Sequence, residues 1–247
     1  GIKTKALKRG NHYILSGTKM FVTDARAADH FLVAARTQAT DKAEDNITLF
    51  LVDAKEWGVY IGDLKTMEVI RKQYEVTFSN VNVPATHIVG HLHGGWPIIE
   101  DTLLKTNALL CAEMMGGAEW VLETTVAYAK DRIAYGVPIG SFQALKHRMA
   151  EMYTDLEHAR PLMVRAVEAI REGSPDAELY VSMAKAYCGD VYESLTNAGV
   201  QLHGGIGFTW DHDMHFYFKR ARWAANSFGN STFHREKVAQ YLERQLL

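Results

Sequence analysis

The sequence predicts an α+β protein in which an antiparallel β domain is followed by an antiparallel, four-helix-type bundle. Residues 1 to about 90 contain short β-branched and aromatic runs separated by turn residues, with no convincing helix. From Trp96 onward, apolar residues recur at spacings of three and four, which is the period of an amphipathic helix. The period changes near Val83-Pro84. We therefore expect two domains, residues 1–92 and residues 93–247.

The first domain is predicted strand by strand. His12–Leu15 and Lys19–Thr23 flank Ser16-Gly17, a pair typical of a tight turn, and so indicate a hairpin. The other β-branched or aromatic runs are Phe31–Ala35, Ile47–Val52, Val59–Ile61 and Tyr74–Phe78. Turn or loop segments between the strands are expected at Thr40–Asn46 and Trp57-Gly58, and Gly90–Gly95 closes the domain.

The second domain is predicted helix by helix. The expected helices are Trp96 to about Arg132, Ser141–Glu172, a third after Gly173-Ser174-Pro175 that ends near Gly204-Gly205, His212–Arg222 and Ser231–Leu247. Ser141 is a candidate N-cap, and Pro175 suits a first-turn position. Long helices with short connections favour an antiparallel bundle.

Composition excludes several classes of function. The formal net charge is −2, and this absence of a basic excess argues against a nucleic-acid or membrane-surface partner. The 11 histidines are scattered without metal-ligand spacing, so no metal is expected. Cys111 and Cys188 both lie in helical patterns, which favours two buried thiols over a disulfide. No run is long enough to span a membrane, and no signal peptide opens the chain.

Three segments stand out by their order and spacing. They are Lys19–Thr23, then Asp131–Gly136 with Pro138–Gln143, and finally Gln201–Phe208. Together they make essentially the whole chain resemble the acyl-CoA dehydrogenase family. The resemblance implies an N-terminal helical domain, a middle β domain and a C-terminal helical domain. We expect the first of these to be missing, together with the acidic, Gly-Ser-rich loop that precedes the β segment in the family.

The resemblance also implies FAD as the cofactor and a set of residues that contact it. These residues are Phe21, Thr23, Arg132, Tyr135, Phe142, Gln143, Gln201, Gly204, Gly205 and Asn230. Phe21 would cover a face of the flavin ring and the Thr23 hydroxyl would hydrogen-bond near N5, since period-two alternation puts both on one face of a strand. The usual aromatic residue at position 21 is Trp, so Phe21 is a conservative departure.

The remaining contacts would serve a flavin held mainly by a neighbouring subunit. The planar guanidinium of Arg132 suits pyrophosphate oxygens, and Tyr135 or Phe142 could pack on the adenine or the dimethylbenzene ring. The Gly204-Gly205 pair would let the backbone approach the ADP half closely. This shared site implies a homodimer, or a homotetramer built as a dimer of dimers.

The usual catalytic base is absent. The family's reaction needs a carboxylate that removes the proton next to the thioester carbonyl. Ungapped counting places that position at Phe228 in most members and at Thr106 in a minority, and neither side chain is a usable base. The acidic residue that some relatives have one step after the glycine is Asn230 here.

Four explanations stay open. Glu100 or Asp101, about one helical turn before Thr106, could reach the site, although both suit an ordinary first helical turn better. The chain could be one subunit of a mixed oligomer whose partner supplies the base, it could catalyse different flavin chemistry, or it could bind flavin or acyl-CoA without turnover. An unrelated β-plus-bundle interaction protein is the alternative from another class.

The resemblance sets the expected partners and compartment. An acyl-CoA would be the substrate, and an electron-transfer flavoprotein would accept the electrons. The expected compartment is the cytoplasm, or the mitochondrial matrix in a eukaryote. The acyl chain itself is not specified by the sequence.

Overall fold

The computed structural model describes residues 2–42 and 44–246. Gly1, Ala43 in the predicted loop at residues 40–46, and Leu247 at the end of the last predicted helix lie outside this part. The chain divides into two compact units, Gly1–Thr102 and Leu103–Leu247. The division falls within the first long helix, ten residues after the predicted start of the second domain at residue 93, and the boundary at residues 92–93 stays a prediction.

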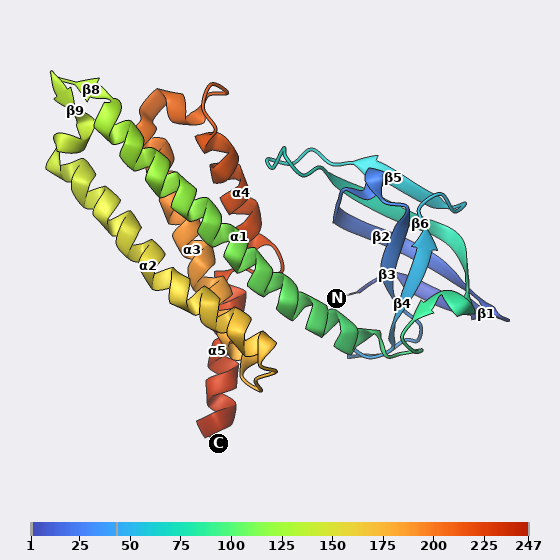
Figure 1. Cartoon of the computed structure of the whole chain (residues 1–247). Helices are drawn as coiled ribbons and strands as arrows, with labels where there is room; N and C mark the ends of the chain where they lie inside the picture. Colours follow the sequence, from blue (N-terminus) through green and yellow to red (C-terminus); the bar gives the residue numbers. More distant parts are fainter. Residues whose placement is uncertain (1, 43, 247) are drawn as a thin grey trace. The chain divides into compact units, whose positions relative to one another are not determined.

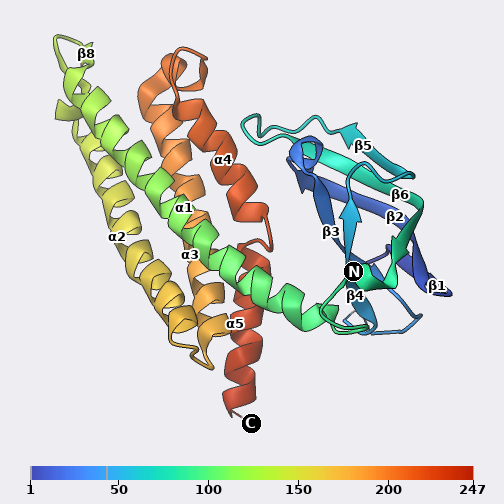
Figure 2. The ribbon, with the colours of Figure 1, turned by 45° about the vertical axis from the view of Figure 1, so that its right-hand side comes forward.

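The first unit contains one seven-stranded sheet (Figures 1 and 2). Its strands are β1 (Lys5–Arg9), β2 (His12–Thr23), β3 (His30–Arg36), β4 (Ile47–Asp53), β5 (Val59–Asp63), β6 (Gln73–Pro84) and β7 (Ile88–Val89). The strand order is β5-β6-β2-β1-β3-β4-β7. The pairings are antiparallel except where Lys5 of β1 meets Arg36 of β3 in parallel. The predicted antiparallel β domain is therefore confirmed with one parallel contact.

Two details of the sheet differ from the prediction. Ser16-Gly17 is not a turn, because β2 runs without a break from His12 to Thr23. Gly17 instead marks a shift in pairing register with β6, at a φ of 148°. The hairpin turn lies earlier, at Gly10-Asn11, and its first strand β1 was not predicted because only Ala6 of its five residues is buried.

Gly17 is needed for a close approach as well as for its backbone angle. A Cβ at this position would lie 2.8 Å from the Cα of Thr4 and 2.9 Å from its Oγ1. We expect Gly17→Ala to lower the free energy of unfolding by about 2–4 kcal/mol, because backbone strain and overpacking add. Gly10→Ala is the matched control, since Gly10 also has positive φ but nothing lies within 4 Å of an added Cβ. Equal urea midpoints for the two variants would contradict this expectation.

The second unit is a helical bundle in which the first four helices alternate in direction, whereas the last helix continues in the direction of the fourth (Figures 1 and 2). The helices are α1 (Gly95–Asp131), α2 (Gln143–Arg171), α3 (Ala177–His203), α4 (Met214–Asn226) and α5 (Ser231–Leu246). A small hairpin, β8 (Ile133–Ala134) and β9 (Val137–Pro138), joins α1 to α2. In the described residues, 3₁₀ turns occur at Ala25–Ala27 and Ala85–His87 in the first unit and at Ile139–Ser141 and Gly204–Phe208 in the second. The predicted antiparallel bundle is confirmed.

Two predicted helix starts were wrong. Ser141 lies in a 3₁₀ turn where its Oγ donates to the carbonyl of Pro138 at 2.7 Å, and α2 begins only at Gln143. Pro175 precedes the first turn of α3, because Asp176 occupies the N-cap. The β8–β9 hairpin, which periodicity did not reveal, takes up the residues before α2.

The middle helix α3 contributes most to the bundle core. It packs against α2, α4 and α5, and its buried residues recur every three or four positions, as in Val181, Ala184, Cys188, Val191 and Leu195. Cys111 and Cys188 are free, fully buried thiols, as predicted. A neighbouring Cys111 side chain and burial raise the pKa of the Cys188 thiol far above its ordinary value.

Candidate functional site

The second and third sequence motifs lie together at one end of the bundle. Tyr128, in the last turn of α1, stacks on His203 at the end of α3 with ring centroids 4.4 Å apart. The Tyr128 hydroxyl also donates to the His203 carbonyl at 3.4 Å. Arg132 follows Tyr128 by one turn, and Gly204 follows His203 directly. Helix packing therefore brings together segments that are about seventy residues apart in the sequence.

The side chains at this end are strongly exposed. Tyr135 is 96% exposed at a φ of 52°, and its ring meets that of Phe142 edge-on at 6.2 Å. Arg132 and Gln143 are exposed as well. Within the described residues, no hydrogen bond or ion pair of the Arg132 guanidinium is found. An exposed aromatic pair beside an unengaged guanidinium suits a ligand with a ring and a phosphate.

The glycines beside these side chains leave their backbone open. A Cβ added at Gly204 or Gly205 would have no atom within 4 Å. Gly207, only two residues later, is packed, since its Cβ would lie 2.8 Å from the Val200 carbonyl oxygen. Gln201 is exposed one turn before the pair. The open backbone, the aromatic rings and Arg132 together fit the ADP half of a dinucleotide.

His203 has a structural role at this end. It is 3% exposed, and its Nδ1 donates to the Gly199 carbonyl at 2.8 Å. Burial lowers the pKa of its imidazole, so the ring is neutral at pH 7. This arrangement fixes the ring that Tyr128 stacks on.

Phe21 and Thr23 lie on β2 in the other compact unit. The register with β6 shifts between Lys19 and Val22, and Phe21 has a φ of 58°. This bulge interrupts the period-two alternation from which a shared face was predicted. Phe21 is 63% exposed and Thr23 is partly buried, so a ligand can still reach the aromatic ring. Their role at a flavin stays a prediction.

One usual base position lies next to a residue that contacts the other. The Nδ2 of Asn107, the residue after Thr106 on α1, approaches the Phe228 carbonyl at 3.5 Å. Phe228 is 46% exposed in the turn between α4 and α5, and its ring lies edge-on to Trp223 at 6.4 Å. The places from which a base would act are therefore neighbours here, and both lack a carboxylate.

The weaker base candidates and Asn230 have other surroundings. Glu100 and Asp101 are exposed in the early turns of α1, within the first compact unit. The Oδ1 of Asn230 accepts from the backbone N–H of Phe233 at 3.0 Å, so this side chain caps α5. Along α1, Asn107 and Tyr128 are about 30 Å apart at the rise of a regular helix. Asn230 and Arg132 of one chain thus do not share one small binding site.

The turn between α4 and α5 accepts hydrogen bonds from two buried side chains, Lys185 and His234, that the sequence analysis missed. Lys185, 1% exposed, donates to the carbonyls of Ala225 at 3.0 Å and Gly229 at 2.9 Å. His234, 2% exposed, contacts the Phe228 carbonyl through Nε2 at 3.2 Å. A carbonyl only accepts, so Nε2 carries the proton and Nδ1 accepts from the Ser182 hydroxyl at 3.3 Å. The one available signal was a lysine within the apolar spacing of α3.

The buried imidazole makes stability depend on pH. Burial, followed by the charge of Lys185, lowers the pKa of His234 from 6.5 to about 4. The unfolded chain therefore binds a proton that the folded chain does not, and stability falls as pH drops from 6.5 towards 4. We expect a loss of about 3 kcal/mol across this window. Urea unfolding at pH 7 and pH 4.5 measures it.

His234→Gln is the control for this pH dependence. Glutamine keeps a donor for the Phe228 carbonyl but does not titrate. The loss between pH 7 and pH 4.5 should shrink in this variant. The charged groups that also act on His234, Lys237 and Glu178, remain in both proteins. Identical pH dependence in the two proteins would show that His234 is not the titrating group.

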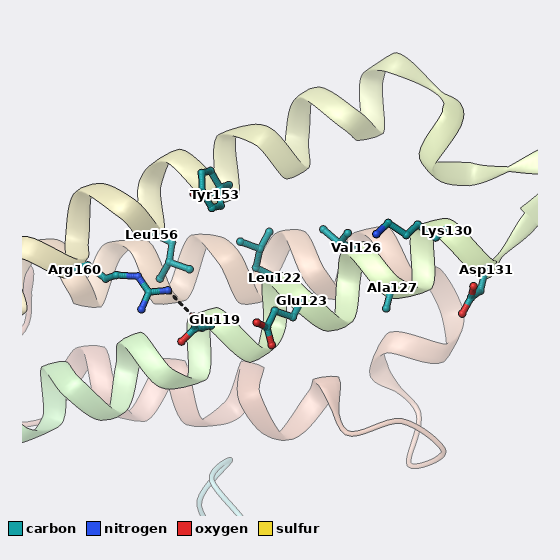
Figure 3. A pocket seen from close by; sticks show the side chains of 10 residues that line it. All are labelled: Glu119, Leu122, Glu123, Val126, Ala127, Lys130, Asp131, Tyr153, Leu156 and Arg160. Atoms are coloured by element: carbon teal, nitrogen blue, oxygen red, sulfur yellow. Dashed lines mark hydrogen bonds and ion pairs between the residues drawn. The ribbon is translucent and has the colours of Figure 1, made fainter.

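A groove of about 490 Å³ lies between α1 and α2 (Figure 3). Leu122, Val126 and Leu156 line it, and the Arg160–Glu119 ion pair of 2.7 Å lies at one end. None of the predicted cofactor residues lines this groove. No group of three or more metal-binding side chains occurs in residues 2–42 and 44–246. Among the helices of the described part, none is long and apolar enough to cross a membrane.

Comparison with known proteins gives consistent matches along the chain. Residues 1–81 match the profile described as the acyl-CoA dehydrogenase middle domain, and residues 93–243 match that of the acyl-CoA dehydrogenase C-terminal domain. The mitochondrial short/branched chain specific acyl-CoA dehydrogenase of Rattus norvegicus is 32% identical over 246 residues, covering 99% of this chain. That alignment covers 56% of the rat protein, so the chain spans about half the length of this relative.

Two solved structures have the same fold over almost the whole chain. Butyryl-CoA dehydrogenase from Megasphaera elsdenii aligns with a TM-score of 0.91 at 28% identity, covering 98% of this chain and 63% of that one. A structure described as the electron transferring flavoprotein of Acidaminococcus fermentans aligns with a TM-score of 0.91 at 31% identity. It covers 98% of this chain and 64% of that one.

Proposed function

The chain belongs to the acyl-CoA dehydrogenase family, and from that membership we propose that the full-length protein binds FAD and an acyl-CoA thioester as a flavin-dependent oxidoreductase. The supporting observation is the exposed end of the bundle, where Arg132, Tyr135 and the open Gly204-Gly205 backbone lie together. Together they match the chemistry of a dinucleotide.

This chain's own residues would bind and orient the cofactor. Arg132 would pair with the pyrophosphate, and Tyr135 with Phe142 would pack on a ring. Gln143 and Gln201 offer amide groups beside them, and Gly204 and Gly205 offer open backbone. On β2, Phe21 would cover the flavin ring and Thr23 would donate its hydroxyl. When bound, flavin supplies the acceptor for a hydride.

We further propose that residues of one copy serve the cofactor of another. The separation of Arg132 from the Asn230 end of the same chain favours this arrangement, because one chain's two ends are too far apart for one small group. The proposed assembly is a homodimer or a dimer of dimers, with an electron-transfer flavoprotein as electron acceptor. The proposed compartment is the cytoplasm, or the mitochondrial matrix in a eukaryote.

The second candidate function is a partner-dependent or non-catalytic subunit on the same fold. The observation that favours it is that the two usual base positions hold Thr106 and Phe228, neither of which has a side chain that accepts a proton. In this case another subunit would supply the carboxylate, or binding would occur without turnover. Glu100 and Asp101 remain the candidates within this chain.

Anaerobic addition of an acyl-CoA to the flavin-loaded, full-length protein tests these functions. Flavin absorbance in the purified protein supports FAD binding, which both candidate functions require. A colourless protein that does not take up FAD contradicts both. Bleaching in a homomeric preparation supports dehydrogenation by this chain. Its loss in Glu100→Gln or Asp101→Asn would identify the base, and no bleaching without a second subunit would favour the partner-dependent function.

A further inference from the structure

The turn that contains Phe228 is held in an unusual backbone conformation. Phe228 has a φ of 56° and Gly229 a φ of 108°, both in the region that side chains disfavour. A Cβ at Gly229 would lie 2.5 Å from the Phe233 ring and 2.8 Å from His234 Nε2. Such a conformation persists only where surrounding contacts fix it.

Three side chains from three helices supply those contacts. Lys185 from α3 holds the carbonyl of Gly229, and His234 from α5 holds that of Phe228. Asn107 from α1 approaches the Phe228 carbonyl from a further direction, with its Nδ2 at 3.5 Å. All three are at most 5% exposed. The carbonyls of Phe228 and Gly229 thus accept hydrogen bonds from buried side chains, whereas Phe228 itself is 46% exposed.

The charge on Lys185 is the costly part of this arrangement. Its ammonium reaches two backbone carbonyls, and in the described part of the chain it makes no ion pair with a carboxylate. Burial lowers the pKa of Lys185, which reflects the desolvation of the ammonium. Two neutral donors could satisfy the same carbonyls with less desolvation. A buried cation beneath one turn is therefore evidence that the position of this turn matters.

We propose that Lys185 and His234 are positioning residues, which fix the turn so that the side chain of residue 228 points outward in one direction. The inference rests on the proposed function, in which residue 228 occupies the place of the catalytic base. The support for a side chain at this position is present although the side chain is not a carboxylate. Lys185 and His234 act through the backbone of the turn and touch no substrate.

A nitroxide label tests the positioning without any measurement of activity. Phe228→Cys would be labelled in the full-length protein, since Cys111 and Cys188 are buried. The spectrum should show one slow component, and His234→Ala should add a fast component. His234→Gln should restore the slow one, because its amide can donate to the Phe228 carbonyl. Arg235→Ala, which removes an exposed ion pair on the same helix, is the control.

Lys185→Met is the second variant, with exposed Lys237→Met as its match. A fast component in Lys185→Met supports the proposal. If Lys185→Met does not fold, the comparison of His234→Ala with His234→Gln tests the proposal by itself. A label that stays equally slow in His234→Ala would overturn the proposal.

A second arm reads the effect on chemistry in the Phe228→Glu background. His234→Ala should lower the rate of flavin bleaching at saturating acyl-CoA at least about tenfold, because small misplacements of a reacting group have large kinetic effects. His234→Gln should recover most of it. Unchanged bleaching in His234→Ala contradicts positioning. No bleaching in Phe228→Glu itself contradicts the proposed function, and the label then tests positioning independently.

Discussion

Phe228→Glu in the flavin-loaded, full-length protein is expected to raise the rate of anaerobic flavin bleaching by an acyl-CoA at least about a hundredfold, the range of a positioned general base. The turn that bears residue 228 is already fixed through the Phe228 and Gly229 carbonyls. Its side chain is exposed, so a glutamate there needs no rearrangement of the core. Stopped-flow absorbance of the flavin measures the rate.

Phe228→Gln separates the carboxylate from other consequences of losing the ring. Glutamine has nearly the shape of glutamate but accepts no proton at neutral pH, so its bleaching rate should stay at the level of the original protein. Both variants lose the edge-on contact with Trp223, and their stabilities should be similar. Equal bleaching by the two variants would show that residue 228 does not face the reacting carbon.

Arg132→Ala is expected to raise the Kd for FAD about ten- to a hundredfold, because a charge-assisted hydrogen bond contributes about 1.5–3 kcal/mol. The guanidinium is exposed beside Tyr135 and the open Gly204 backbone, without a protein partner in the described residues. Its removal therefore costs the fold little. Equilibrium titration of the flavin-free protein with FAD measures the change.

Arg148→Ala serves as the control for Arg132→Ala. Arg148 is an exposed arginine on α2 that pairs with Glu151 at 3.1 Å. Its removal changes the net charge by the same amount and should leave the Kd for FAD unchanged. Raising the salt concentration should reduce the difference in the Kd for FAD between Arg132→Ala and the original protein, because exposed charges are screened. Equal Kd values in the two variants would exclude Arg132 from the cofactor site.

Regular segments of this chain were predictable because their signals are local. The strands Ile47–Val52 and Phe31–Ala35 and the first long helix agree with β4, β3 and α1. The β-branched runs predict the two strands, and the spacing of three and four predicts the helix, without any information on the rest of the fold. Helix packing then brings the segments that contain Arg132 and Gly204 to one end of the bundle, and their role at a cofactor stays a prediction.

Features that depend on distant residues were not predictable in this way. Gly17 looked like a turn residue, but its glycine is needed because Thr4 of a neighbouring segment lies against it. The bulge at Phe21 depends on how β2 pairs with β6. The support beneath Phe228 joins three helices, so no window of sequence contains it. Lys185 alone reads as a misplaced charge in an apolar helix.

The two buried thiols also make it possible to measure how often the helical bundle opens. Cys111 and Cys188 are both fully shielded from solvent between α1 and α3, and the raised pKa of Cys188 keeps it from forming a thiolate. Alkylating reagents can therefore react with these thiols only when the two helices separate. The rate at which mass is added to these sulfurs in the native protein reports how often the bundle comes apart.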